Sequence, residues 1–545
     1  MSPAFAFTLR RAGCGLTRRI GAALLAAVVS GAGVAAQQRT PPPPLAPRAG
    51  VTPGLETRLT LEELVELVLK QNPGIQAARI DRESAALGLQ AARGLFDPQI
   101  TADSSYEQRV TPVSSTLAGA PDGRLEDKTL LFAPTIAGLM PWGGGTYTST
   151  FSSSRAVSDN AFVPLRPQYP TYLSITFTQP LMRNRGIDQG RRQLQVAQVN
   201  QALTDAQFRQ QVTDIVTAAT LAYWDLSFAI ENLDVQQDGL TEAREQVAAN
   251  RRMADAGLLS RMDVIEAEAQ VAIFEGNAAV AQTILTRTEN ALKALMLPDR
   301  ASPLWSHAVT PVTPPSAQPV TMSVDQAVRL ALANRPERTA LDRSADINAI
   351  DTQFHRGQAQ AQVDLIGGYT MQGLAGQPVA LPGIDPSTIP DFLIGGYGTS
   401  LGLMFERDFP VAHIGLRLTL PIWNRTAEAN VALSLAAGRR LALQKAQLEQ
   451  SIESDVRNAL QTLRSAEAQL AAAVAGRDAA AQQYDSEERR LASGLSTVYL
   501  LFQRHSALVS ARGRENQART ELSKATMEFE RVTGTTLERH GISIP

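Results

Sequence analysis

The residue types that most often carry out chemistry in proteins are few and scattered in this chain. Histidine, the commonest metal ligand and general base, occurs five times, and no two histidines have the spacing of a metal-binding motif. We therefore interpret each as a surface or internally satisfied side chain rather than a ligand. The five are His307, His355, His413, His505 and His540.

Nucleophiles and phosphate-binding loops are equally sparse. The one cysteine, Cys14, lies in the N-terminal segment, and the glycine run at 143–145 lacks the lysine and following helix of a phosphate-binding loop. Ser–His–Asp sites form only in space, but no nucleophile-elbow pattern supports one. The sequence predicts a protein that is not an enzyme and uses no cofactor or metal.

The first 36 residues have the form of a secretory signal peptide. Four arginines precede an apolar, alanine-rich run that ends in small residues at Val34 and Ala36. A membrane anchor is the alternative, but the run is short and interrupted by glycines. Cleavage after Ala36 would remove Cys14, and with it any disulfide. It would leave 47 basic and 53 acidic side chains, a balance that argues against nucleic-acid binding.

Beyond this segment, the chain is built from one unit used twice. Three landmarks recur in the same order, which is typical of an internal repeat. They are a capping box followed by a proline, a strand–proline–helix junction (174–186 and 416–426), and a helix–glycine–helix turn at Gly257 and Gly494. The capping boxes and prolines are Thr60, Glu63 and Pro73, and then Ser323, Gln326 and Pro336.

The repeat sets the predicted domain boundaries. The signal peptide, 1–36, precedes a Pro-rich linker, 37–58. The first repeat spans 59–320, the second spans 321–538, and 539–545 is a short tail. Each repeat is predicted to contain a helix, strands and a long helical hairpin.

The hairpins contain helices far longer than a globular domain needs. No proline interrupts 187–256, so this segment predicts a helix of roughly 105 Å. The helix that returns from Gly257 carries apolar residues at heptad positions, as in a coiled coil. These are Val264, Val271, Ala278, Leu285 and Leu292, with Ala267, Phe274, Ala281, Thr288 and Leu295 three places on. In the second unit they are Leu501, Leu508, Leu522 and Phe529, and Glu515 interrupts the seam.

The predicted strands alternate apolar and polar residues. Leu173, Ile175 and Phe177 alternate with hydroxyl residues, and the run from Ile414 to Leu420 follows the same period. A soluble sheet shows this pattern too. Export, the predicted absence of disulfides and the long helices favour contact of the apolar face with lipid instead.

A lipid-facing sheet must close, because unpaired edge amides in a bilayer cost several kcal/mol each. Two main strands per unit give four per chain, and three chains would give twelve. The segment 129–154 predicts a further hairpin that turns at 143–145, and whether it joins the barrel is open. The matching segment 373–410 reads as a Gly/Pro-rich loop.

Over about residues 55–538, the order of these features resembles the TolC-like outer-membrane channel family. The resemblance implies a mixed α and β fold with the duplicated helix–strand–hairpin unit. It also implies a homotrimer that forms a twelve-stranded transmembrane β-barrel in outer-membrane lipid, continued by an α-helical coiled-coil tunnel in the periplasm. The implied function is a passive exit duct that serves an inner-membrane pump through a periplasmic adaptor protein.

The resemblance assigns roles to the glycine turns. Both match the Gly-Leu pattern of the family's periplasmic tip, where the adaptor docks and the tunnel narrows. Glycine is also required there simply for its permissive backbone angles. The implied adaptor contacts are Gly257, Leu258, Leu259, Ser260, Gly494, Leu495, Ser496 and Thr497.

Acidic residues six and nine places after the tip glycine can form a cation-selective ring in this family. The first unit has Asp263 and Glu266 there, whereas the second unit departs from the pattern with Leu500 and Gln503. Asp263 has another interpretation, because Ser260 and Asp263 form a capping box. Leu500 could contribute to a hydrophobic constriction instead.

Two functional alternatives stay open. Small-molecule efflux and type I protein secretion use the same kind of duct, and the pump and adaptor choose the substrate. A different class is a periplasmic coiled-coil scaffold with a small soluble β domain. Extraction separates these classes, because only a barrel needs detergent to leave the outer membrane.

Overall fold

The computed structural model describes residues 48–114, 119–120, 122–314, 321–380 and 388–542. The predicted signal peptide and the first half of the Pro-rich linker, residues 37–47, lie outside this part. The end of the linker is a strand, because β1 (Glu56–Leu59) pairs in parallel with β6 (Ala308–Pro311). Short 3₁₀ turns occur at Gly94–Phe96, Pro303–Ser306 and Asp391–Leu393.

Each repeat begins with two short helices, and side-chain caps mark the starts of three of the four. Helices α1 (Leu61–Gln71) and α2 (Pro73–Arg93) correspond to α5 (Val324–Asn334) and α6 (Pro336–Gln358). Both predicted capping boxes are present, at Thr60 with Glu63 and at Ser323 with Gln326. In both repeats, proline opens the second helix, where its missing N–H is not needed.

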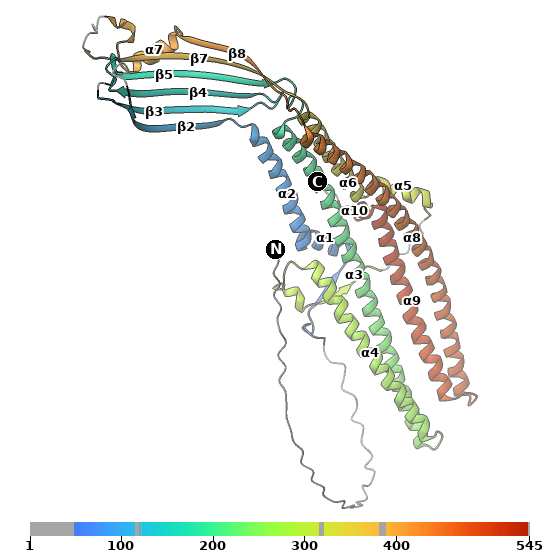
Figure 1. Ribbon diagram of the computed structural model, residues 1–545. Helices are drawn as coiled ribbons and strands as arrows, with labels where there is room; N and C mark the ends of the chain where they lie inside the picture. Colours follow the sequence, from blue (N-terminus) through green and yellow to red (C-terminus); the bar gives the residue numbers. More distant parts are fainter. Residues whose placement is uncertain (1–47, 115–118, 121, 315–320, 381–387, 543–545) are drawn as a thin grey trace, which may run out of the picture. The chain divides into compact units, whose positions relative to one another are not determined.

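Six strands form one antiparallel sheet in the order β2-β3-β4-β5-β7-β8 (Figure 1). The expectation of four strands per chain is wrong. The first unit supplies β2 (Gln99–Pro112), β3 (Arg124–Leu139), β4 (Thr146–Ser158) and β5 (Leu165–Pro180), and the second supplies β7 (Gln362–Pro378) and β8 (Pro410–Thr419). The predicted 129–154 hairpin is confirmed as β3–β4, and it joins the same sheet.

The strand register divides the sheet into an apolar and a polar face. One row across all six strands reads Ile100, Ile136, Ser149, Ile175, Tyr369 and Ala412. The next row reads Thr101, Thr135, Thr150, Ser174, Thr370 and Val411 on the opposite face. Hydroxyls of that row contact each other, with 3.0 Å between Thr135 Oγ1 and Thr150 Oγ1. Thr370 Oγ1 also donates to Ser174 Oγ at 3.0 Å.

The apolar face is exposed in the single chain, even at large side chains. Ile414 is 81% exposed and Ile100 is 73% exposed, at opposite edges of the sheet. The alternation predicted for β5 and β8 is therefore confirmed and extends over six strands. Large apolar side chains of this face include Ile100, Tyr106, Val110, Leu130, Phe132, Ile136, Tyr147, Phe151, Leu173, Ile175, Phe177, Leu365, Tyr369, Met371, Ile414, Leu416 and Leu418.

One end of the apolar face carries helix α7 (Tyr397–Glu406), which packs on β5 and β7. The prediction of a loop over 373–410 is wrong for the α7 segment, which is helical. Its side chains Leu403 and Met404 are buried, and this packing stabilises the helix. Gly373 permits this packing, since a Cβ at that position would lie 1.9 Å from the Ser400 carbonyl oxygen. The hydroxyls of Thr171 and Ser400, 2.7 Å apart, also join the helix to the sheet.

Two long helical hairpins follow the strands. The first pairs α3 (Gln189–Asp255) with α4 (Arg261–Met296), and the second pairs α8 (Arg425–Ala492) with α9 (Val498–Thr533) (Figure 1). Helix α3 has 67 residues and α8 has 68, so each extends for about 100 Å. A short helix, α10 (Thr536–Arg539), ends the described chain.

Six of the ten seam positions predicted in α4 are buried, and Val264, Val271, Thr288 and Leu295 are part-buried. Ala267, Phe274, Ala278, Leu285 and Leu292 are each at most 3% exposed along α4. In α9, Glu515 does interrupt the apolar seam and is itself buried. Its carboxylate accepts from Arg519 Nη2 at 2.5 Å and lies 3.3 Å from Arg477 Nε. Two arginines therefore compensate the charge at the interruption.

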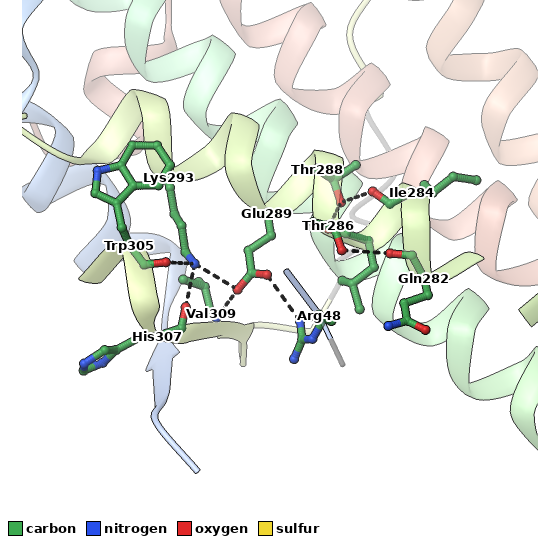
Figure 2. Close-up of polar contacts among 11 residues, drawn as sticks. Arg48, Gln282, Ile284, Thr286, Thr288, Glu289, Lys293, Trp305, His307 and Val309 are labelled. Atoms are coloured by element: carbon green, nitrogen blue, oxygen red, sulfur yellow. Dashed lines mark hydrogen bonds and ion pairs between the residues drawn. The ribbon is translucent and has the colours of Figure 1, made fainter. Parts of the chain in front are cut away.

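The β1–β6 pair is joined to the long helices by buried polar groups. Lys293 Nζ donates to the carbonyl oxygens of Trp305 and His307 at 3.0 and 2.6 Å and lies 3.3 Å from Glu289 Oε1. Glu289 also accepts from the Val309 N–H and contacts Arg48, as Figure 2 shows. Lys293 and Glu289 are 0% and 1% exposed, so these two charged side chains are inaccessible to water.

Candidate functional site

The two hairpin tips have the same backbone structure. Gly257 and Gly494 both have a φ of 74°, in the left-handed region. At the first tip, the Leu258 N–H donates to the Met253 carbonyl at 2.9 Å, and the Gly257 N–H donates to Ala254. The second tip repeats this pattern, with Leu495 donating to Arg490 at 2.8 Å. This is a Schellman motif, so the backbone reason for glycine is met at both tips.

The return helices start within a few residues of the glycines. Ser260 caps α4, where Ser260 Oγ accepts from the Asp263 N–H at 3.3 Å and Asp263 Oδ2 accepts from the Ser260 N–H at 3.1 Å. Thr497 caps α9 by accepting from the Leu500 N–H at 3.4 Å. Ser260 and Thr497 therefore both have a structural function at the helix start. The capping-box interpretation of Asp263 is confirmed.

The side chains at the tips differ in exposure. Leu258 and Leu495, each directly after its glycine, are 79% and 72% exposed. Leu259 instead packs against the cluster between the hairpins, and Ser496 donates to Glu487. Of the eight predicted adaptor contacts, the two exposed leucines therefore present the most apolar surface to a partner.

The four predicted gate residues occupy equivalent places in the two hairpins. Asp263 and Glu266 are the third and sixth residues of α4, and Leu500 and Gln503 are the third and sixth of α9. Asp263 is half-buried by its cap, whereas Glu266 and Gln503 are exposed and Leu500 is 38% exposed. Within one chain, Asp263 and Glu266 lie on the first hairpin and Leu500 and Gln503 lie on the second. A ring of gate residues would therefore need several chains.

A contact between the hairpins was missed by sequence reasoning. His505 Nε2 on α9 lies 2.5 Å from Glu242 Oε2 on α3, and the histidine ring packs near Phe274 of α4 and Tyr484 of α8. Gln270 Nε2 adds a bond between hairpins by donating to Ser506 Oγ at 3.0 Å. All four long helices therefore meet at His505, a buried side chain that lies beside Glu242 and joins the hairpins.

Burial lowers the pKa of His505 below its usual 6.5, and Glu242 opposes this shift only partly. The unfolded chain thus binds the proton more readily than the folded one. Stability from this site is present above pH 6.5 and is lost as pH falls below it.

We expect the thermal midpoint to fall between pH 7.5 and 5.5 by more in the unaltered protein than in His505→Phe. Buried acids such as Glu530, whose pKa is raised by burial, act in the opposite direction and cancel in this comparison. Equal slopes would contradict the expectation.

Within the described residues, no three His, Cys, Asp or Glu side chains gather closely enough to hold a metal ion. Among the helices that the structure describes, none combines the length and the apolar character needed to cross a bilayer.

Comparisons with known proteins agree with this architecture. Residues 169–296 match the family model described as outer membrane efflux protein. The sequence search of curated proteins gives no match. The fold is similar to that of the outer-membrane channel OprN, with a TM-score of 0.61, 16% identity, and coverage of 87% of this chain and 90% of that one.

Two further channel structures are similar over most of their length. The CmeC outer membrane channel of Campylobacter jejuni has a TM-score of 0.61 and 14% identity, covering 87% of this chain and 86% of that one. VceC of Vibrio cholerae has a TM-score of 0.59 and 16% identity, covering 87% and 96%. The chain carries an outer membrane efflux protein domain and has the fold of the TolC-like outer-membrane channels.

Proposed function

We propose that the protein is the homotrimeric outer-membrane exit duct of a tripartite export system. It conducts small molecules passively from an inner-membrane pump and a periplasmic adaptor to the exterior. The observation that carries this proposal is the six-stranded sheet, which has one exposed apolar face, one polar face and two open edges. Lipid can cover the apolar face, and copies of the chain can satisfy the edges.

The long hairpins fit the periplasmic part of such a duct. Helices of about 100 Å extend away from the sheet and end in turns that share one backbone structure and expose a leucine. A pump and an adaptor would supply the energy. Type I protein secretion is the alternative use of the same duct.

The first test is the particle mass and extraction behaviour of the full chain from outer membranes. A trimer that needs detergent and carries a long hollow projection supports the duct. A monomer or dimer released without detergent would contradict it and favour the periplasmic coiled-coil scaffold. Substrate accumulation in cells lacking the protein then distinguishes small-molecule efflux from protein secretion.

The exposed tip leucines give a prediction for adaptor docking. We expect the double substitution Leu258→Ser and Leu495→Ser to lower dye efflux about tenfold, because losing two apolar anchors costs roughly 1.4 kcal/mol or more. Val280→Ser removes a side chain that is 61% exposed on α4, about 30 Å from the tip, and is the matched control. Unchanged efflux in a double variant that still forms trimers would place the adaptor elsewhere.

Glu266 gives a prediction for the gate. We expect Glu266→Gln to lower the cation-to-anion permeability ratio of the reconstituted channel by about two- to fivefold, because three exposed carboxylates would lose their charge together. Asp263 is a poorer probe, since its substitution also disturbs the α4 cap. Glu453→Gln, on the surface of α8, is the control. An unchanged ratio would remove Glu266 from the gate.

A further inference from the structure

The six strands of one chain divide unequally between its two repeats. In the second repeat, β7 follows α6, β8 precedes α8, and the two strands pair directly. In the first repeat, β2 follows α2 and β5 precedes α3, which makes them the counterparts of β7 and β8. Strands β3 and β4 lie between β2 and β5. The β3–β4 hairpin is thus an addition that the second repeat lacks.

This hairpin is built into the sheet on both sides. The β2–β3 ladder runs without a break from Gln99 with Ala137 to Pro112 with Arg124, and β4 pairs with β5 from Thr146 to Ala156. Its outward residues Leu130, Phe132 and Ile136 are 51%, 50% and 42% exposed, so they continue the apolar face. The hydroxyls of Thr135 and Thr150 continue the polar row on the other face.

The sheet ends in two edges that suit each other. Five successive antiparallel pairings make β2 and β8 run in opposite directions. Strand β8 of one copy can therefore pair antiparallel with β2 of the next copy. Both strands carry the apolar face to the edge, at Ile100 and Ile414. The partner that fits these edges is a second copy of this chain, and pairing continues until the ring closes.

We propose that three chains close a barrel of eighteen strands rather than twelve, with β2 of each chain paired to β8 of its neighbour. This inference rests on the proposed trimeric duct. Strands spaced about 4.8 Å apart and tilted about 40° give a barrel about 36 Å across for eighteen strands and about 24 Å for twelve. The larger barrel belongs to the size class whose interior holds an aqueous channel.

The helices support the larger number. Four helices of each chain adjoin the sheet, α2, α3, α6 and α8, so three chains contribute twelve helices at that end. At about 8–10 Å between axes, twelve helices need a circumference of about 96–120 Å. Eighteen tilted strands need about 113 Å, whereas twelve need only about 75 Å. An eighteen-stranded barrel therefore continues the helical ring without a step in width.

The test is an end-on electron-microscopy map of the full chain, extracted from outer membranes and held in nanodiscs. We expect a trimer whose barrel is about 36 Å across. A membrane trimer with a barrel of about 24 Å and β3–β4 outside the ring would overturn the inference while leaving the proposed duct intact. A particle that is not a membrane trimer would overturn both.

A cysteine panel tests the strand contact directly. Ser105 on the polar face of β2 is changed to cysteine together with one polar-face position of β8: Val411, His413, Gly415 or Arg417. We expect one pair to give covalent trimers under oxidation. If no cysteine pair gives disulfide-linked chains and the map shows the narrow barrel, the inference is contradicted.

Deleting residues 124–158 removes β3 and β4 and leaves β2 and β5 antiparallel. We expect the barrel of this variant to narrow by about one third, to about 24 Å. An unchanged width would show that the hairpin lies outside the ring. The map of the unaltered protein decides the question if the deletion prevents folding.

Discussion

Lys293→Met is expected to destabilise the folded chain by about 3–5 kcal/mol, because it leaves a buried carboxylate without its main compensating charge. Glu289 is 1% exposed and would keep only the Val309 N–H and Arg48, whose guanidinium is partly open to water. The carbonyl oxygens of Trp305 and His307 would also lose their donor. A fall in the thermal midpoint of the detergent-extracted protein measures this loss.

Two further variants test the cause. Lys293→Met combined with Glu289→Leu removes both charges, so its loss should be smaller than the sum of the two single losses. Arg457→Ala breaks an exposed ion pair with Glu453 on α8 and should cost less than about 1 kcal/mol. Additive losses in the double variant would show that the two charges are not coupled.

Tyr223→Phe is expected to cost about 2 kcal/mol, although it removes a single oxygen atom. The Tyr223 hydroxyl is fully buried, donates to the Leu59 carbonyl at 2.9 Å, and accepts from the Thr313 N–H at 3.0 Å. Phenylalanine fills the same space but leaves the part-buried Thr313 N–H without this acceptor. The thermal midpoint should fall while the trimer, if formed, keeps its mass.

Tyr499→Phe is the matched control for this hydroxyl. Tyr499 on α9 is 57% exposed, so water can replace any contact that its hydroxyl makes. Its substitution should change stability by less than about 0.5 kcal/mol. Equal effects at the two tyrosines would mean that the Tyr223 hydroxyl does not hold β1 and β6 to α3.

The helices and their ends could be predicted from sequence because their signals are local. Capping boxes at Thr60 and Ser323, prolines at the starts of α2 and α6, and glycines at the tips act within a few residues. The heptad seam of α4 was visible for the same reason, since positions such as Phe274 and Leu285 repeat along one helix. Each of these elements is present in the structure.

The number of strands could not be predicted from sequence. The alternation of apolar and polar residues that marks a strand is weak where serine and threonine occupy both faces of the sheet. Strand β2 presents Ala102 and Ser104 on its apolar face, so only Ile100 and Tyr106 mark the pattern over seven residues. Helix α7 was hidden by glycines in a segment whose helix depends on tertiary contacts with Gly373. Packing against distant strands decided both outcomes.

The contacts that join the hairpins could not be predicted either. His505 and Glu242 are separated by 263 residues and meet only because α3 and α9 pack together. Neither has a neighbour in sequence that marks it as special. The gate and adaptor positions, by contrast, were assigned from a short Gly-Leu pattern that occurs at both tips. Their roles stay predictions.

The opposite directions of β2 and β8 limit how a channel of this kind can change its calibre during evolution. Adding one strand would make the two edges parallel and prevent antiparallel closure between copies. Only the addition or loss of a whole hairpin, two strands at a time, keeps the two edge strands antiparallel. In a trimer each such event adds six strands at once, so calibre would evolve in discrete steps of about 12 Å in diameter. A single duplication or loss of a hairpin in one gene could thus change the cargo that the whole assembly admits.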